Sequence, residues 1–320
     1  MNIEMINAAA ARLAPVVRRT PMLSSPFLDE MAGRRVLVKA ESLQHTGSFK
    51  FRGGWSALSG MSEAQRANGV IAYSSGNHAQ GVALAAAKFG VPAVIVMPED
   101  SPKLKVANTQ ALGAEVVTYD RLRDSREEIG AQLAAERGLT LVKPYDEPLV
   151  IAGQGTIGLE ILEQATAEGI ETADVLIPCG GGGLTSGISV TFEGTDLRAR
   201  TCEPEEFDDV ARSLASGERE VNATQGGSIC DAIVTNSPGE ITFPIMLKNC
   251  GPGLVVNDEE AMRAVAIAYQ RLKIVLEPGG AVALAAALFH ADKVEGDAVI
   301  VVATGGNVDT DVFTQCLELL

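Results

Sequence analysis

The chain has 320 residues, enough for about two domains of the usual ~150 residues. Hydrophobic residues make up 46% of it and charged residues 21%, a balance that supports a large packed core and excludes a disordered chain. The 41 acidic residues outnumber the 26 basic ones, giving a net charge of −15, and no run of Lys or Arg forms a basic patch. This composition argues against a nucleic acid or an anionic membrane as a partner.

Residues 1–20 contain no uninterrupted apolar core and carry Glu4 early, unlike a signal peptide. Apolar runs such as residues 93–97 are far shorter than the ~20 residues that span a bilayer. The 5 cysteines are widely spaced and form no CxxC pair, which predicts reduced core thiols rather than disulfides or a zinc site. We therefore expect a cytoplasmic protein.

Short runs rich in Val and Ile alternate with helical patterns along the whole chain. These runs are apolar on both faces, as is typical of buried parallel strands. They lie at residues 35–41, 69–74, 93–98, 115–119, 140–144, 174–179, 197–203 and 298–304. A helix expected over 77–89 ends before Gly90, a C-capping glycine. The alternation predicts an α/β protein with parallel sheets, whose ligands bind where strand ends meet helix starts.

The first candidate site follows strand 35–41. Lys50 opens an expected helix over 49–60 and has Phe49 and Phe51 beside it. An apolar pocket lowers the pKa of a lysine amine and makes it competent for Schiff-base chemistry. The alternative is a surface lysine whose stem packs along an amphipathic helix.

The second candidate site is Ser74-Ser75-Gly76-Asn77-His78, between strand 69–74 and the helix after it. Hydroxyl groups and free backbone N–H groups at a helix N-terminus suit a carboxylate. The alternative is an ordinary N-cap made by Ser or Asn. His78 falls on the first turn, where it either contacts the ligand or packs in the core.

Two glycine-rich turns and an acidic loop follow later strands. Glycines 180–183 after strand 174–179 fit backbone N–H groups that close around a phosphate, although a tight turn without ligand is the alternative. The run is neither GxGxxG nor GxxxxGK[ST]. Thr304 opens a similar turn, TGGNVD, after the last strand. The acidic run at 203–209 suits a hard cation such as Mg²⁺ or Ca²⁺, or else is a solvated loop.

Taken together and in this order, these motifs resemble the fold-type II pyridoxal-phosphate (PLP) enzymes of the threonine dehydratase and serine racemase family. The resemblance covers nearly the whole chain. It is carried by RTP at 19–21, GSFKFRG at 47–53, SSGNHAQG at 74–81, IAGQGT at 151–156, GGGG at 180–183, LEPGGA at 276–281 and TGGNVD at 304–309.

The resemblance implies a role for each motif. Lys50 is implied as the Schiff-base lysine, with Phe49 packed near the cofactor, Asn77 bonded to the ring hydroxyl and Thr304 facing the pyridine nitrogen. A neutral hydroxyl at that nitrogen weakens the electron sink, which favours prompt loss of a β leaving group. The phosphate is implied to lie on Gly180, Gly181, Gly182 and Gly183.

The same resemblance implies the substrate contacts and a metal site. Ser74, Ser75, Asn77 and His78 are implied around the substrate carboxylate, and Ser75 matches the second acid/base of serine racemases. Arg126, at the start of a helix expected over 125–137, resembles an arginine that reaches the active site of serine racemases and 3-hydroxyaspartate dehydratases. The alternative is a surface arginine paired with a neighbouring carboxylate. The implied ligands of a divalent cation (Mg²⁺, Mn²⁺ or Ca²⁺) are Glu203, the carbonyl of Phe207, and Asp209.

The implied fold is α/β and tryptophan synthase β-like, with two lobes that each hold a mostly parallel sheet flanked by helices. We expect a large PLP-binding lobe from residues 1–54 and 147–320 and a small mobile lobe from 55–146. The implied activity is a dehydratase that converts threonine, serine or 3-hydroxyaspartate into a 2-oxo acid and ammonia, in a homodimer. A serine or other amino-acid racemase on the same scaffold is the alternative, and a non-catalytic PLP-scaffold binding protein is a more distant one. Asp231-Ala232-Ile233 departs from the racemase pattern, which predicts a reshaped substrate pocket.

Overall fold

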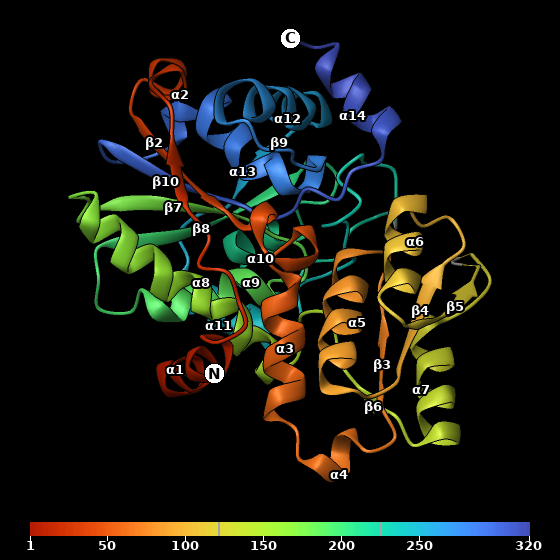
Figure 1. Cartoon of the computed structure of the whole chain (residues 1–320). Helices are drawn as coiled ribbons and strands as arrows, with labels where there is room; N and C mark the ends of the chain where they lie inside the picture. The colour runs from red at the N-terminus through yellow and green to blue at the C-terminus, as the bar shows by residue number, and fades with distance from the viewer. Residues whose placement is uncertain (121, 225) are drawn as a thin grey trace.

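The computed structural model describes residues 1–120, 122–224 and 226–320, and its strands form two sheets (Figure 1). The six-stranded sheet has the order β1-β2-β10-β7-β8-β9, and the four-stranded sheet has the order β5-β4-β3-β6. Apart from β1, which is antiparallel to β2, neighbouring strands are parallel. The strands are β1 Met22–Ser24, β2 Arg35–Ala40, β3 Val70–Tyr73, β4 Ala93–Pro98, β5 Glu115–Tyr119, β6 Thr140–Leu141, β7 Ala173–Pro178, β8 Leu197–Pro204, β9 Leu254–Val256 and β10 Ala298–Ala303.

Helices connect the strands and cover the faces of both sheets (Figure 1). The α-helices are α1 Ile3–Leu13, α2 Pro26–Ala32, α3 Lys50–Gly60, α4 Glu63–Arg66, α5 Asn77–Phe89, α6 Lys103–Ala111, α7 Arg126–Arg137, α8 Pro148–Ala167, α9 Gly183–Thr191, α10 Asp209–Ser216, α11 Thr242–Asn249, α12 Asp258–Leu272, α13 Pro278–Phe289 and α14 Thr310–Leu317. Short 3₁₀ turns lie at η1 Glu41–Leu43, η2 His45–Gly47 and η3 Ala291–Lys293.

The two faces of the six-stranded sheet take alternate residues of each strand, because successive side chains of a strand point to opposite faces. Val299 and Val301 of β10 pack with α12 and α13, whereas Ile300 and Val302 pack with α8 and α9. Every residue of β7 and of β10 is buried. Helices on both faces explain why these strands read as continuous apolar runs.

The four-stranded sheet is built in the same way on a smaller scale. Val70 and Ala72 of β3 pack towards α3 and α5, whereas Ile71 and Tyr73 pack towards α7. Its strands come from one continuous stretch, residues 70–141, while the strands of the other sheet come from both sides of that stretch. The lobe boundaries expected at 54/55 and 146/147 stay a prediction.

The structure confirms the predicted α/β class, and it corrects the details of several elements. Predicted strand 140–144 ends at Leu141, and the residues after it run towards the cavity described below. Predicted strand 35–41 ends at Ala40, because Glu41 begins a 3₁₀ turn. The short strands β1 and β9 were not predicted. No helix in the described part of the chain combines the length and the apolar character needed to cross a membrane.

Candidate active site

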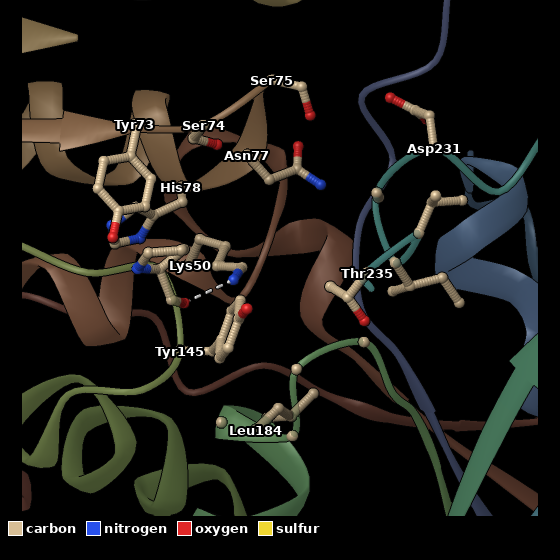
Figure 2. Close-up of a pocket in the computed structure, with 18 of the residues that line it drawn as sticks. Lys50, Tyr73, Ser74, Ser75, Asn77, His78, Tyr145, Leu184, Asp231 and Thr235 are labelled. Carbon is tan, nitrogen blue, oxygen red and sulfur yellow. Dashed lines mark hydrogen bonds between the residues drawn. The ribbon is translucent and has the colours of Figure 1, made fainter. Parts of the chain in front are cut away.

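A cavity of about 430 Å³ lies where the carboxyl ends of strands from both sheets meet helix starts (Figure 2). Residues 73–75 come from the end of β3, residues 178–183 follow β7, and Thr304 follows β10. Parallel sheets place their ligand sites at this edge. The predicted cofactor and substrate residues all line the cavity: Phe49, Lys50, Ser74, Ser75, Asn77, His78, Arg126, Gly180, Gly181, Gly182, Gly183 and Thr304.

Lys50 is the first residue of α3 and its amine lies inside the protein. Its Nζ donates a hydrogen bond to the carbonyl oxygen of Pro144 at 2.9 Å and lies 5.1 Å from the ring centroid of Phe49. Burial lowers the pKa of this amine to about 8, although the charge of Glu277 opposes the shift. The backbone N–H of Phe49 donates to the carbonyl oxygen of Thr304 at 3.1 Å, which ties the lysine to the end of β10. The structure therefore contradicts the alternative of a surface lysine.

The start of α5 is open towards the cavity. Its N-cap residue is Gly76, so neither Ser nor Asn makes the ordinary side-chain N-cap that was the alternative for this segment. Asn77 donates through Nδ2 to Glu277 and accepts through Oδ1 from Asn307 at 2.9 Å. His78 Nε2 lies 3.0 Å from the carbonyl oxygen of Val142, and burial lowers the pKa of this imidazole to about 3. His78 is therefore a neutral, packed residue at the edge of the cavity.

The glycine run opens α9 in the same way. Gly182 is the N-cap of α9 and has a φ of 90°, in the left-handed region that favours glycine. A Cβ atom at Gly181 would lie 2.3 Å from the ring of Tyr145, so only glycine fits there. Thr242 Oγ1 donates to the carbonyl oxygen of Gly181 at 2.6 Å and fixes the loop. The first N–H groups of α9 are thus left for an anion in the cavity.

Arg126 combines features of both interpretations of this residue. Its Nε lies 2.8 Å from Glu127, the neighbouring carboxylate of the surface alternative. Its guanidinium also lies 5.2 Å from the ring centroid of Tyr73, lines the cavity and leaves 40% of the side chain exposed. The arginine can therefore face a ligand without breaking a buried ion pair.

The three predicted metal ligands do not line this cavity and lie around the start of α10. Glu203 is fully buried, and its carboxylate accepts hydrogen bonds from the backbone N–H groups of Val210 and Ala211 at 2.9 and 2.7 Å. One oxygen of Asp209 accepts from Asn222 at 2.6 Å, and the other has no hydrogen-bond partner among the described residues.

The pKa values of these two carboxyl groups reflect their burial. Burial and the nearby Asp209 raise the pKa of Glu203 well above its usual range, and burial raises the pKa of Asp209 to about 7. Within the described ranges, no cluster of three or more His, Cys, Asp or Glu side chains is placed to hold a metal. The predicted set differs from such a cluster because its third ligand is the backbone carbonyl of Phe207.

Lys105 and Tyr145, which line the cavity, and Glu277, which pairs with Lys105, were not predicted as site residues. Lys105 of α6 is 2% exposed and lies 2.9 Å from Glu277 and 3.0 Å from Asp231. Tyr145 follows the carbonyl that holds Lys50. Glu277 lies within the LEPGGA motif, which could have indicated it, whereas Lys105 and Tyr145 stand in no motif. Ala232 and Ile233 line the cavity beside Asp231, which agrees with the expectation that this segment shapes the pocket.

Comparison with known proteins gives a consistent result. The L-threo-3-hydroxyaspartate ammonia-lyase of Pseudomonas sp is 43% identical over 313 residues, 97% of this chain and 96% of that protein. The structure of a threonine deaminase from T.th. has a TM-score of 0.90 at 42% identity, covering 97% of this chain and 99% of that one. Maize serine racemase has a TM-score of 0.92 at 34% identity, covering 99% and 97%. The model of the family described as pyridoxal-phosphate dependent enzyme matches residues 13–305, and the chain therefore belongs to this family, with its tryptophan synthase β-like fold.

Proposed function

We propose that the chain is an ammonia-lyase that removes water from a small β-hydroxy α-amino acid and yields a 2-oxo acid and ammonia. One observation carries the proposal: two helix N-termini, each capped by a glycine, open into one cavity beside the buried amine of Lys50. Each N-terminus suits one anion, the phosphate of the cofactor at α9 and the carboxylate of the substrate at α5. The names of the similar ammonia-lyase and threonine deaminase support the reaction.

The cavity fits PLP by its shape and by its donors. A Cβ atom at Gly181 or Gly183 would come within 2.3 or 2.9 Å of Tyr145, so the glycine loop can form its cradle only with glycine. Gly180 to Gly183 would hold the phosphate, Lys50 the aldehyde carbon, Asn77 the ring hydroxyl and Thr304 the ring nitrogen. PLP, when bound, supplies the electron sink that lowers the energy of removing the α-proton.

Different residues of the chain would carry out the proton transfers and bind the substrate. With a pKa of about 8, the Lys50 amine is neutral in part of the molecules near neutral pH and can take the α-proton. Figure 2 shows Ser75 on another side of the cavity from Lys50. Ser75 would bind the substrate carboxylate with Ser74 during elimination, and would be the second acid/base in a racemisation. His78, neutral and bonded towards Val142, would shape the pocket rather than carry charge.

Arg126 supports 3-hydroxyaspartate as the preferred substrate, with serine and threonine as weaker ones. Its planar guanidinium can bind a second carboxylate through two hydrogen bonds, which a methyl group cannot replace. Its partner Glu127 is 58% exposed, so water can stabilise that carboxylate when the arginine turns to the substrate.

A panel of β-hydroxy amino acids, assayed together for ammonia, 2-oxo acid and inverted amino acid, tests the proposal. We expect ammonia and 2-oxo acid in equal amounts, with 3-hydroxyaspartate as the best substrate. Inverted amino acid without ammonia would instead identify a racemase, the alternative that the similarity to maize serine racemase favours. A cofactor absorption band without turnover of any substrate would identify the non-catalytic binding protein.

We also propose that Glu203, the carbonyl of Phe207 and Asp209 hold a divalent cation. The support is the buried oxygen of Asp209, which has no hydrogen-bond partner among the described residues, and the position of this group beside Glu203, a second carboxyl group whose pKa burial also raises. The cation would stabilise the start of α10 and not the reaction. EDTA should lower the melting temperature of the wild type, and Mg²⁺, Mn²⁺ or Ca²⁺ should restore it. A Glu203→Gln/Asp209→Asn variant should not respond to EDTA; an equal response in both proteins would contradict the site.

The predicted homodimer and cytoplasmic location remain proposals. Phe27 and Met31 of α2 are 51% and 43% exposed, and Arg271 of α12 lies 4.4 Å from the ring of Phe27. Apolar side chains exposed in this way suit a subunit contact. Light scattering should give twice the mass of the chain for the wild type and a monomer for Phe27→Glu/Met31→Glu; a monomeric wild type would contradict the dimer.

A further inference from the structure

Tyr145 is held firmly between two parts of the active site. On one side, Pro144 accepts the hydrogen bond from the Lys50 amine at 2.9 Å. On the other side, Asp146 accepts hydrogen bonds from the backbone N–H groups of Ile241 and Thr242 at 2.8 and 3.3 Å. Because the residues before and after it are both anchored, the position of Tyr145 is set by the backbone.

The orientation of the Tyr145 ring is set by the glycine loop. A Cβ atom at Gly181 would lie 2.3 Å from the ring, and one at Gly183 would lie 2.9 Å from Cα of Tyr145. In Figure 2 the hydroxyl end of the ring is directed towards the end of the Lys50 side chain. The hydroxyl makes no hydrogen bond to another described residue, although Tyr145 lines the cavity. The Tyr145 hydroxyl can therefore donate a hydrogen bond to a ligand in the cavity.

Arg126 acts on the same hydroxyl. Burial raises the pKa of Tyr145, and the positive charge of Arg126 is the strongest influence that opposes this. Both groups line the same cavity and can serve two substituents on one carbon atom of a ligand bound there. A β-carboxylate would face the guanidinium, and a β-hydroxyl would face Tyr145.

We propose that Tyr145 is a catalytic acid that donates its hydroxyl proton to the β-hydroxyl group of the substrate as the Cβ–O bond breaks. This inference rests on the proposed ammonia-lyase function. The oxygen leaves with the electron pair of the Cβ–O bond and, with the proton of Tyr145, becomes water. The electron pair of the Cα–H bond becomes the new Cα=Cβ bond, while Lys50 keeps the α-proton. Transfer of that proton from the Lys50 ammonium to the Tyr145 phenolate restores both groups.

Other groups of the cavity suit this step less well. The His78 imidazole has a pKa of about 3, so the ring is neutral at neutral pH. A neutral imidazole is a poor proton donor. The ring of Tyr73 lies against the Arg126 guanidinium, but the negative charge of Glu127 acts on its hydroxyl more strongly than Arg126 does and, with burial, raises its pKa. Tyr145 combines a fixed ring, an unpaired hydroxyl and the neighbouring cation that would stabilise its phenolate.

The leaving group provides the test. Chloride leaves as an anion without being protonated, whereas a hydroxyl group needs a proton and leaves as water. Tyr145→Phe should lower kcat/KM on serine by ~10²-fold or more, the usual size of a general-acid effect, and should change kcat/KM on β-chloroalanine less than about 3-fold. The matched control is Tyr73→Phe, which should leave the ratio between the two substrates unchanged. Titration of each apoprotein with PLP, followed by absorbance, should show an unchanged cofactor affinity.

A second measurement uses the wild type alone. Its kcat/KM on serine should fall at alkaline pH as Tyr145 loses its proton, and its kcat/KM on β-chloroalanine should not show this additional fall. The charged groups that act on the hydroxyl are Arg126, Asp146, Asp209 and Glu127. Equal losses on both substrates in Tyr145→Phe, or identical pH profiles in the wild type, would overturn the inference and leave the proposed function intact. A wild type that releases ammonia from neither substrate would overturn the proposed function as well.

Discussion

The wall of the cavity that follows β7 of the six-stranded sheet is a glycine loop of backbone groups, whereas the wall formed at the four-stranded sheet consists of side chains. On the first wall, Gly180 to Gly183 present the open N-terminus of α9, and the close contacts of Gly181 and Gly183 with Tyr145 exclude a Cβ atom. On the second wall, Ser75, Lys105 and Arg126 contribute hydroxyl and charged groups.

The difference between the two walls separates the roles of cofactor and substrate. A backbone cradle can be altered only by changing the fold of the loop, so it suits a group that every member of a family binds. A side chain on the second wall can be replaced by another residue type without a change in the fold of the backbone. Arg126 is an example, because its ion-pair partner Glu127 is exposed. Substrate preference should therefore depend on the wall of the four-stranded sheet. Four predictions test this comparison.

The largest effect should come from Lys50, which lies between the two walls. Lys50→Ala should lower kcat by at least ~10³-fold, because it removes both the covalent attachment and the base. Borohydride reduction should fix PLP to the peptide that contains Lys50 in the wild type, as shown by mass spectrometry. The exposed Lys88 provides the control, and Lys88→Ala should keep full turnover. Attachment of PLP to another lysine would contradict the mechanism.

The next effect concerns the contact between the two walls. Lys105 of α6 pairs with Asp231 and Glu277; burial lowers its pKa, but these two carboxylates outweigh burial and raise it. Lys105→Met would leave the buried Glu277 without its cation and should lower the free energy of unfolding by about 3 kcal/mol. Urea unfolding measures this change.

The control for Lys105 stands two residues earlier on the same helix. Lys103 is exposed, and Lys103→Met should change the free energy of unfolding by less than about 0.5 kcal/mol. Equal stabilities of the two variants would show that the two walls are not joined through Lys105.

Arg126 tests substrate preference directly. Arg126→Ala should lower kcat/KM on 3-hydroxyaspartate tens- to several-hundred-fold more than on serine, about 2–4 kcal/mol, because only the first substrate has a second carboxylate. Arg137 ends the same helix and pairs with Glu115 on the surface, so Arg137→Ala should leave both values unchanged. Equal losses on both substrates in Arg126→Ala would assign the arginine to packing.

The smallest effect belongs to the framework of the six-stranded sheet. Burial would raise the pKa of Asp174, but hydrogen bonds from Arg198 and Arg200 lower it below its usual value. A carboxyl group whose pKa is lower in the folded state stabilises the fold above its unfolded pKa and loses this contribution as the pH falls through its folded pKa. Asp174→Asn should therefore cost about 2 kcal/mol at pH 7 and progressively less below about pH 4. Urea unfolding of the wild type and of Asp174→Asn at pH 7 and below about pH 4 checks this. A difference in the free energy of unfolding between the two proteins that does not change with pH would contradict it.

The sequence was sufficient for the parts of the site that depend on local chain chemistry. Parallel strands buried on both faces read as apolar runs, and a glycine run at a helix start indicates a backbone cradle. The motif around Lys50 and the segment Ser74 to His78 also carried the resemblance, and the structure brings both to one cavity. The short strands β1 and β9 were missed because three residues show no periodicity.

The amino-acid sequence by itself determined the α/β class, the buried strands and which segments meet at the cavity, because these follow from periodicity and from residue types that the backbone requires. Only the tertiary structure decided that Lys105 joins Asp231 and Glu277, and that Tyr145 packs on the glycine loop beside Lys50. These partners lie far apart in the sequence and belong to ordinary residue types. Their pairings and pKa values depend on which groups the fold buries beside them. A local sequence pattern cannot predict this.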